Sequence, residues 1–375
     1  MSGLIVHEWL EPRGGAERVV ESMREAFPEA DLLALWNDAP ETYSDAQETW
    51  IARTPLRRHK ALALPFLPWV WRNVRPYKYS SSHDWILISS HLFAHHVRPH
   101  GADREVPKFV YAHTPARYLW TPELDQRGDS AMVKAAAGLL KPLDKRRAQE
   151  PAMIASNSEY IRRRIQDTWG RDSTVIYPPV DVEKIQSVSD WSTQLSESEL
   201  ERLEALPEEF ILGASRLVPY KRLDRVIIAG DANNVPVVIA GSGPEEHYLR
   251  ALGKSMSVPV HFIGNPSNQL LFALYQRARV FVFPAIEDFG IMPVEAQAAG
   301  TPVVTTSLGG ATESCIPGVS GHASLEDSQA GIDEAVAEVL SSSSFEVPKE
   351  AVSRFSRQAF RRNLRDWMAG YDADY

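Results

Sequence analysis

Two glutamates, Glu287 and Glu295, frame the segment of this sequence best suited to chemistry. Residues 280–284 form an apolar run that predicts a buried strand, and Glu287 follows it after two residues. Pro293 suits the first turn of a helix, and Gly300 suits its end. Glu287 is therefore expected in the loop at the carboxyl edge of a sheet, where ligands bind open α/β sheets.

The start of the helix predicted after Glu287 offers backbone N–H groups to a phosphate or to sugar hydroxyls. These groups belong to Phe289, Gly290, Ile291 and Met292, and Gly290 allows close approach of a ligand to the backbone. A plain strand, loop and helix carrying two solvated glutamates is the alternative, and composition alone favours that alternative.

Cations follow the first predicted strand of the second half of the chain. Residues 213–222 read GASRLVPYKR and include Arg216 and Lys221. Two cations near a helix start can hold a diphosphate leaving group without a metal ion. Arg222 is better explained as a solvated side chain.

In the first half, two segments follow predicted strands. Gly14 and Gly15 form a tight turn that leaves room for a diphosphate at the backbone, although an ordinary turn is the alternative. The spacing of a dinucleotide-binding motif is not met, because a third glycine is missing. His113 comes directly after the run 108–112, and either a ligand contact or a structural hydrogen bond explains it.

The elements that must position these residues alternate along the chain. Short apolar runs separated by helix-length segments predict parallel strands covered on both faces, and hence a doubly wound α/β fold. We expect an N-terminal Rossmann-like domain over 1–180, a linker over 181–207 and a second Rossmann-like domain over 208–352, with the two domains facing each other across a cleft. The helical segment within 353–375 either completes the second domain or returns to the first.

Length and composition fit this plan. The chain has 375 residues, enough for two domains, and its 44% apolar content predicts a core in each. One cysteine excludes an internal disulfide and a cysteine-based zinc site. The net charge of −9 argues against a nucleic-acid partner. No apolar run is long enough to span a membrane, and no signal peptide is recognised, so we expect a cytoplasmic protein.

Residues 51–83 differ from the rest of the chain because they contain seven cations and no acidic residue. Tryptophan and leucine lie among these cations, so the part over 53–78 predicts contact with an anionic membrane surface or a lipid diphosphate. A helix that packs on the core with a basic outer face is an equal alternative. No metal site is expected, since Asp372 and Asp374 are better explained as acids of a frayed tail.

The motif from Glu287 to Glu295, with Phe289-Gly290 inside it, closely resembles the retaining family-4 glycosyltransferases of the GT-B fold. The resemblance extends over nearly the whole chain, in order, through Gly14-Gly15, His113 and the pair Arg216 and Lys221. The opening Gly-Gly-Ala-Glu-Arg is similar to that of bacterial mannosyltransferases of surface-polysaccharide assembly.

The resemblance implies transfer of a hexose, with retention of configuration, from a sugar nucleotide to a glycan or lipid-linked glycan, without a cofactor. GDP-mannose is the donor that it favours. It implies that His113 and Glu287 contact the donor sugar, that Glu295 grips the ribose, and that backbone near Gly264 passes along the nucleobase. A UDP- or ADP-sugar enzyme, an epimerase and a non-catalytic sugar-nucleotide-binding module remain alternatives.

Overall fold

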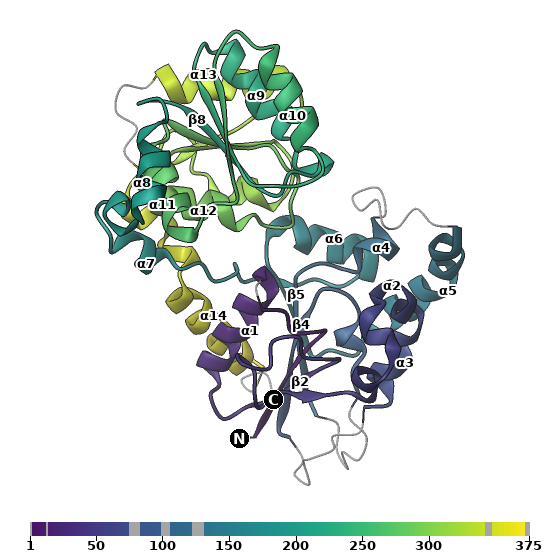
Figure 1. The fold of residues 1–375 in the computed structure, drawn as a ribbon. Helices are drawn as coiled ribbons and strands as arrows, with labels where there is room; N and C mark the ends of the chain where they lie inside the picture. The colour runs from purple at the N-terminus through teal and green to yellow at the C-terminus, as the bar shows by residue number, and fades with distance from the viewer. Residues whose placement is uncertain are drawn as a thin grey trace. The chain divides into compact units, whose positions relative to one another are not determined.

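The computed structural model describes residues 2–12, 14–74, 83–98, 106–121, 131–341 and 347–371, with backbone only at 61 and 131–137. The chain forms two compact units (Figure 1). Unit 1 contains Met1–Pro179 and Gln358–Tyr375, and unit 2 contains Val180–Arg357. Each unit is built around one sheet.

Unit 1 has a seven-stranded sheet whose strands all run parallel, in the order β3-β2-β1-β4-β5-β6-β7. The strands are β1 (Gly3–His7), β2 (Asp31–Ala34), β3 (Gln47–Glu48), β4 (Trp85–Ser90), β5 (Lys108–Ala112), β6 (Met153–Ser156) and β7 (Thr174–Val175). Because β1, β4 and β5 are neighbours, their carboxyl ends lie together at one edge of the sheet.

Strand β1 shows why this sheet is buried on both faces. Leu4 and Val6 belong to one apolar core, and Ile5 between them belongs to the core on the opposite face. Successive strand side chains point to opposite faces, so a run without polar residues must be covered twice. The predicted doubly wound architecture is confirmed in this unit.

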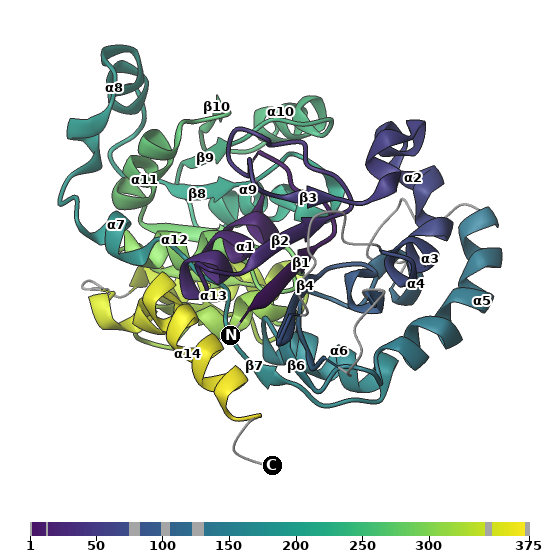
Figure 2. The same cartoon turned by 90° about the horizontal axis from the view of Figure 1, so that it is seen from below.

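The helices of unit 1 cover both faces of its sheet (Figures 1 and 2). They are α1 (Gly15–Ala26), α2 (Lys60–Ala63), α3 (Leu67–Arg72), α4 (Arg117–Trp120), α5 (Ala131–Arg147), α6 (Glu159–Trp169) and α14 (Arg357–Ala369), with 3-10 turns η1 (Trp50–Arg53), η2 (Pro55–Arg58), η3 (Leu64–Phe66) and η4 (Ala94–His96). Helix α14 lies beside α1, where Arg361 pairs with Glu25 and Leu364 joins the same core as Val19. The C-terminal helix therefore returns to the first unit.

Unit 2 has a six-stranded parallel sheet in the order β10-β9-β8-β11-β12-β13. The strands are β8 (Ile211–Ala214), β9 (Val237–Ala240), β10 (Val260–Gly264), β11 (Val280–Phe283), β12 (Val303–Thr305) and β13 (Gly321–Ala323). Both sheets are parallel and helix-covered, so the predicted fold class holds for both units.

The helices of unit 2 are α7 (Val182–Gln186), α8 (Glu197–Glu204), α9 (Leu223–Ala232), α10 (Glu246–Lys254), α11 (Asn268–Arg277), α12 (Ile291–Ala298) and α13 (Gln329–Ser341), with 3-10 turns η7 (Trp191–Gln194), η8 (Pro219–Lys221), η9 (Gly310–Ser314) and η10 (Lys349–Phe355). Residues 181–207, expected as a linker, belong to this unit. Trp191 packs against Phe272 of α11, and Arg277 donates to the carbonyl of Leu203 in α8. Packing of these short helices on α11 makes the segment part of a folded body.

Candidate active site

Lys221 and Glu287 form an ion pair at the carboxyl edge of the unit 2 sheet. Lys221 ends η8 in the segment after β8, and Glu287 lies in the loop between β11 and α12. Strands β8 and β11 are paired, which brings these two loops together. Lys221 Nζ lies 2.5 Å from Glu287 Oε1. The structure therefore joins two residues that the sequence placed in separate motifs.

The surroundings of this pair are partly apolar. The side chains of Lys221 and Glu287 are only 12% and 18% exposed. Lys221 Nζ lies 5.4 Å from the centre of the Tyr220 ring and 5.5 Å from that of Phe283, within reach of a cation–π interaction. Arg216 is exposed, and its Nη2 donates to the Tyr220 hydroxyl at 2.8 Å. Two cations thus lie close to one tyrosine, Arg216 at its hydroxyl and Lys221 at its ring.

A glycine turn shapes the loop that carries Glu287. Gly310 donates its N–H to the Glu287 carbonyl at 2.8 Å. A Cβ at Gly310 would lie 2.1 Å from the carbonyl oxygen of Asp288, and a Cβ at Gly309 would lie 2.9 Å from that of Glu287. The two loops approach so closely that only glycine fits at these positions. The pair Gly309-Gly310 therefore holds the backbone on either side of the Glu287 side chain.

Helix α12 begins beside the same loop. Gly290 precedes it with φ +90°, a conformation that other residues rarely adopt, and no side chain caps the helix. The backbone N–H groups of Ile291 and Met292 lie in its first turn, with both residues half-buried. Phe289 is buried and packs against Phe355, and Glu295 is buried in the helix. The predicted donor-binding residues are thus close in the chain but differ in exposure.

The ends of β9 and β10 complete this edge of the sheet. Gly264 ends β10 with φ +70°, and open space surrounds the position of a Cβ. Its carbonyl accepts the N–H of Gly241, which follows β9, at 2.6 Å. A Cβ at Gly241 would lie 1.8 Å from the Ser215 carbonyl, so this glycine lets the loops after β8 and β9 touch. Gly264 itself faces space that a ligand can occupy.

In unit 1, the turn at Gly14 and Gly15 begins α1. Gly14 has ordinary extended backbone, but a Cβ there would lie 1.9 Å from a carboxylate oxygen of Glu17. Glu17 accepts the backbone N–H of Glu11, and burial raises the pKa of its carboxyl group. A carboxylate therefore lies beside the turn where we expected a diphosphate. A role for Gly14 and Gly15 in donor binding stays a prediction.

His113 follows β5, as expected, and is connected to the other central strands of unit 1. Its Nε2 lies 2.8 Å from Ser89 Oγ, which in turn lies 3.0 Å from His7 Nδ1. Burial lowers the pKa of His113 well below the usual range, and the neighbouring His91 and His7 lower it further. The His113 imidazole is therefore held in its neutral form.

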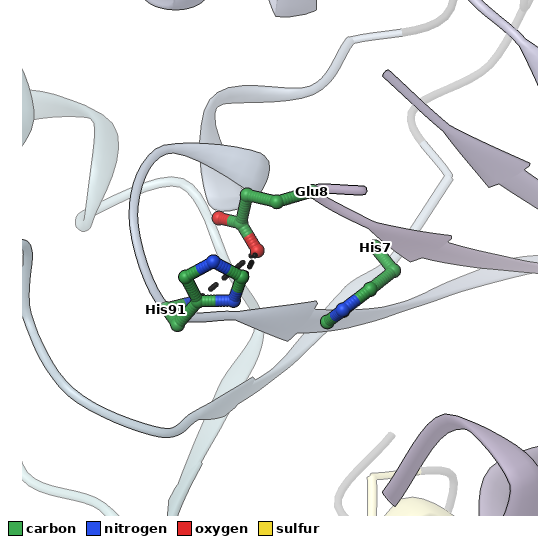
Figure 3. Close-up of side chains that lie close together, drawn as sticks. All are labelled: His7, Glu8 and His91. Atoms are coloured by element: carbon green, nitrogen blue, oxygen red, sulfur yellow. Dashed lines mark hydrogen bonds and ion pairs between the residues drawn. The ribbon is translucent and has the colours of Figure 1, made fainter. Parts of the chain in front are cut away.

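Strand β1 and the loop after β4 bring together three side chains that the sequence did not connect (Figure 3). Glu8 is fully buried, and its Oε1 accepts the backbone N–H groups of Leu92 and Ala94 at 2.9 and 2.8 Å. Its Oε2 lies 3.2 Å from His91 Nδ1. One ligand atom each from His7, Glu8 and His91 lie within 4.8 Å of one another.

The pKa values of this group follow from burial and mutual charge. Burial lowers the pKa of His7 to about 4, with a further contribution from His91. Burial also acts to raise the pKa of Glu8, but His91, His7 and the backbone N–H donors outweigh it, and the pKa is lowered. Glu8 is ionised at neutral pH. Only the pair His7-Glu8 is visible in the sequence, because His91 lies more than 80 positions away.

The basic segment packs some of its apolar side chains in the core and leaves others exposed, and its contact with a membrane stays a prediction. Leu67, Val70 and Trp71 are buried in the core of unit 1, whereas Leu62, Phe66 and Trp69 are more than half exposed.

The cations of this segment are mostly paired. Arg57 binds Asp38 at 2.8 Å, Lys60 binds Glu11, and Arg72 binds Glu150 at 2.8 Å. Arg75 and Lys78 lie outside the described residues, as do Asp372 and Asp374. No helix among the described residues is both long and apolar enough to cross a membrane.

Comparison with protein families gives two matches. The family model "Glycosyltransferase Family 4" matches residues 13–184, and the model "Glycosyl transferases group 1" matches residues 197–362. These ranges fall on unit 1 and unit 2.

Curated relatives align over parts of the chain. A GDP-mannose-dependent monoacylated alpha-(1-6)-phosphatidylinositol monomannoside mannosyltransferase of Corynebacterium glutamicum is 30% identical over 43% of this chain and 45% of its own length. A GDP-mannose-dependent alpha-(1-6)-phosphatidylinositol monomannoside mannosyltransferase of Mycobacterium tuberculosis is 29% identical over 58% of this chain and 61% of its own. The chain spans less than two thirds of each of these relatives.

Solved structures match over almost the whole chain. Anabaena HepE in complex with UDP superimposes with a TM-score of 0.67 and 18% identity, covering 99% of this chain and all of HepE. Sucrose-phosphate synthase of Thermosynechococcus elongatus gives a TM-score of 0.71 at 15% identity, covering 100% of both chains. At such identities the likeness establishes the fold.

Proposed function

The chain belongs to the family-4 glycosyltransferases of the GT-B fold, and from that premise we propose that it transfers a hexose from a sugar nucleotide to a glycan or lipid-linked glycan acceptor. The observation that carries the proposal is the Lys221–Glu287 pair at the carboxyl edge of the unit 2 sheet. A shielded cation and a hydroxyl-binding carboxylate lie side by side there. A cation can bind the diphosphate of a sugar nucleotide, and a carboxylate can bind the hydroxyls of the attached sugar.

In the proposed reaction, the bond between the anomeric carbon and the diphosphate oxygen breaks, and the acceptor hydroxyl oxygen bonds to the same face of that carbon. The acceptor proton passes to the departing phosphate, so configuration is retained without a protein nucleophile. Lys221 and Arg216 neutralise the negative charge that builds on the diphosphate as the bond breaks. They supply this charge without a metal ion.

The remaining roles follow from position. Glu287 accepts hydrogen bonds from donor-sugar hydroxyls, and Glu295 accepts those of the ribose. The N–H groups of Ile291 and Met292 donate to the donor at the start of α12. Gly264 leaves space for the base beside the end of β10. The sugar contact proposed for His113 rests on its sequence motif.

GDP-mannose is the donor we propose. Two relatives whose alignments cover large parts of this chain are named as GDP-mannose-dependent mannosyltransferases. A UDP-sugar is the second candidate, because HepE, which shares the fold, has been solved with UDP-glucose. The base would be read largely by backbone near Gly264, so no single side chain decides between them.

We also propose that the protein works at the cytoplasmic face of a membrane as a peripheral enzyme. Leu62, Phe66 and Trp69 project from consecutive short helices of unit 1 and are 57%, 53% and 59% exposed. Arg58 and Lys60 lie beside them in the sequence. Apolar side chains flanked by cations suit an anionic lipid surface, where a lipid-linked acceptor would be found.

Donor hydrolysis and transfer, measured over a panel of GDP-mannose, UDP-glucose, UDP-N-acetylglucosamine and ADP-glucose, test this function. We expect GDP-mannose to be consumed fastest, in a reaction that chelator does not inhibit. Consumption of a different sugar nucleotide would replace the donor assignment but keep the enzyme class. Failure to bind any member in calorimetry would reject the sugar-nucleotide site and favour the non-catalytic alternative.

A further inference from the structure

We propose that His7, Glu8 and His91 form a binding site for one divalent transition-metal ion, of which Zn²⁺ fits the ligand types best. Two imidazoles and one carboxylate are a ligand set of zinc that leaves a fourth position open. In unit 1, one ligand atom from each side chain lies within 4.8 Å of the other two. This site is separate from the Lys221–Glu287 pair and does not depend on the proposed reaction.

His7 has a nitrogen available for a metal ion. Its Nδ1 lies 3.2 Å from the Ser89 carbonyl oxygen. Nδ1 also lies 3.0 Å from Ser89 Oγ. In the tautomer that donates Nδ1–H to these Ser89 oxygens, the lone pair of the neutral imidazole is on Nε2. That Nε2 is buried and has no hydrogen-bond partner within the part of the chain that the structure describes. A hydrogen bond from the opposite nitrogen to a carbonyl is the usual outer-shell support of a metal-binding histidine.

Glu8 has one oxygen committed to structure and one that faces His91. Oε1 accepts the N–H groups of Leu92 and Ala94, which fixes the loop after β4 around the carboxylate. Oε2 has longer contacts, 3.2 Å to the backbone nitrogen of His91 and 3.2 Å to its ring nitrogen Nδ1. A metal ion can therefore bind Oε2 while the loop keeps its hydrogen bonds to Oε1.

The geometry is close to that of a bound ion. Zinc bonds of about 2.0–2.1 Å in a tetrahedron place neighbouring ligand atoms ~3.4 Å apart. The separation of 3.2 Å between Glu8 Oε2 and His91 Nδ1 is close to this value. It is also the length of an Nδ1–H···Oε2 hydrogen bond, so an ion at this position would replace the proton on Nδ1. The ligand atoms of the three residues lie within 4.8 Å of one another, so completing the set requires His7 to move toward the other two. His91 is 26% exposed, so an ion has a route from solvent to the buried ligands.

A second cluster, formed by His95, His96 and Asp144, is a poorer site. The Asp144 carboxylate already accepts the indole N–H groups of Trp120 and Trp169 at 2.7 and 2.8 Å. It also lies 2.9 Å from His96 Nε2. All three members are fully buried, and a metal ion would have to displace hydrogen bonds made by tryptophans of the core. This cluster is explained by those hydrogen bonds alone.

Titration with Co²⁺, which reports tetrahedral coordination through its visible absorption, tests the site on the chelator-treated 375-residue chain. We expect saturable binding of one equivalent, reversed by Zn²⁺. His91→Ala and Glu8→Gln should each weaken Co²⁺ binding at least tenfold and abolish the tetrahedral spectrum. His59→Ala, which removes an exposed histidine of unit 1, is the matched control and should bind as the parent does.

Three outcomes would overturn the site: a parent protein that binds no Co²⁺ or Zn²⁺, a His91→Ala variant that binds as tightly as the parent, or a loss of binding in His96→Gln alone. Circular dichroism and thermal unfolding establish that each variant is folded. If His91→Ala is unfolded, His91→Asn takes its place, since it keeps a polar side chain at the same half-exposed position.

Discussion

The Lys221 ammonium lies 2.5 Å from a carboxylate oxygen of Glu287, although 66 positions separate the two residues in the chain. Glu287 thus neutralises the cation that we expect to meet a diphosphate. A ligand phosphate must share Lys221 with Glu287 or replace it. Removing either partner therefore changes the charge that the other presents to a ligand.

Lys221→Ala is expected to lower kcat by about 10²–10³-fold, because it removes a charge that stabilises the leaving diphosphate. The variant should still fold, with a modest fall in melting temperature, because it takes Lys221 away from the shielded Glu287 carboxylate. Arg222→Gln is the matched control, as Arg222 is the adjacent cation and is exposed. Turnover of Lys221→Ala within a few fold of the parent would reject the assignment.

Glu287→Gln is expected to change the ratio of two affinities, that for the free nucleoside diphosphate and that for the sugar nucleotide. The free nucleoside diphosphate should bind at least as tightly as to the parent, because Lys221 loses its competing partner. The affinity for the sugar nucleotide should fall about 10–100-fold relative to the affinity for the free nucleoside diphosphate. This is the effect of weakening a charged hydrogen bond to sugar hydroxyls. Calorimetry with both ligands measures the ratio. Equal losses for both would assign Glu287 to the diphosphate or to the fold.

Gly310→Ala should destabilise unit 2 by about 1–3 kcal/mol, because its Cβ would lie 2.1 Å from the Asp288 carbonyl. The forced displacement of the Glu287 loop should also lower donor affinity. Gly138→Ala is the control, since nothing lies within 4 Å of the added Cβ and alanine favours the helix. Chemical denaturation measures the free energy of unfolding of both variants. Equal stability of the two variants would show that the turn can relax.

Acid should weaken unit 1 through Glu150, whose pKa is lowered to about 2. Burial acts to raise this pKa, but hydrogen bonds and charge from Lys108, Arg147 and Arg72 outweigh it. The stabilising charge is complete above the usual value of 4.5 and is lost as pH falls from there to about 2. Glu150→Gln should therefore make the free energy of unfolding of unit 1 depend less steeply on pH over this range. Exposed Glu208→Gln should leave the slope unchanged.

Replacing Leu62, Phe66 and Trp69 together by serine should weaken binding to phosphatidylglycerol vesicles at least tenfold, because these side chains supply the exposed apolar surface of the basic segment. Tyr248, Val319 and Leu325, also exposed but in unit 2, are replaced by serine as the matched control. Cosedimentation with the vesicles measures the binding of both variants. Unchanged binding of the first variant would remove the membrane proposal.

Local patterns in the sequence were sufficient to predict the main strands and the helix after Glu287. Runs such as 280–284 and 108–112 are continuous and apolar, which is the mark of strands buried on both faces. Strands β2, β3 and β13 were not predicted from the sequence. Residues 47–48 and 321–323 form no continuous apolar run, and the pairing of β3 with β2 and of β13 with β12 defines them.

The kind of chemistry available in unit 2 can be read from the sequence, because the glycines, cations and glutamates there occur in compact motifs after recognisable strands. Which of these residues meet depends on the folded structure. The pairing of β8 with β11 joins Lys221 to Glu287, and the pairing of β1 with β4 joins His7 and Glu8 to His91. Strand order is set by packing over the whole sheet, and no local pattern records it.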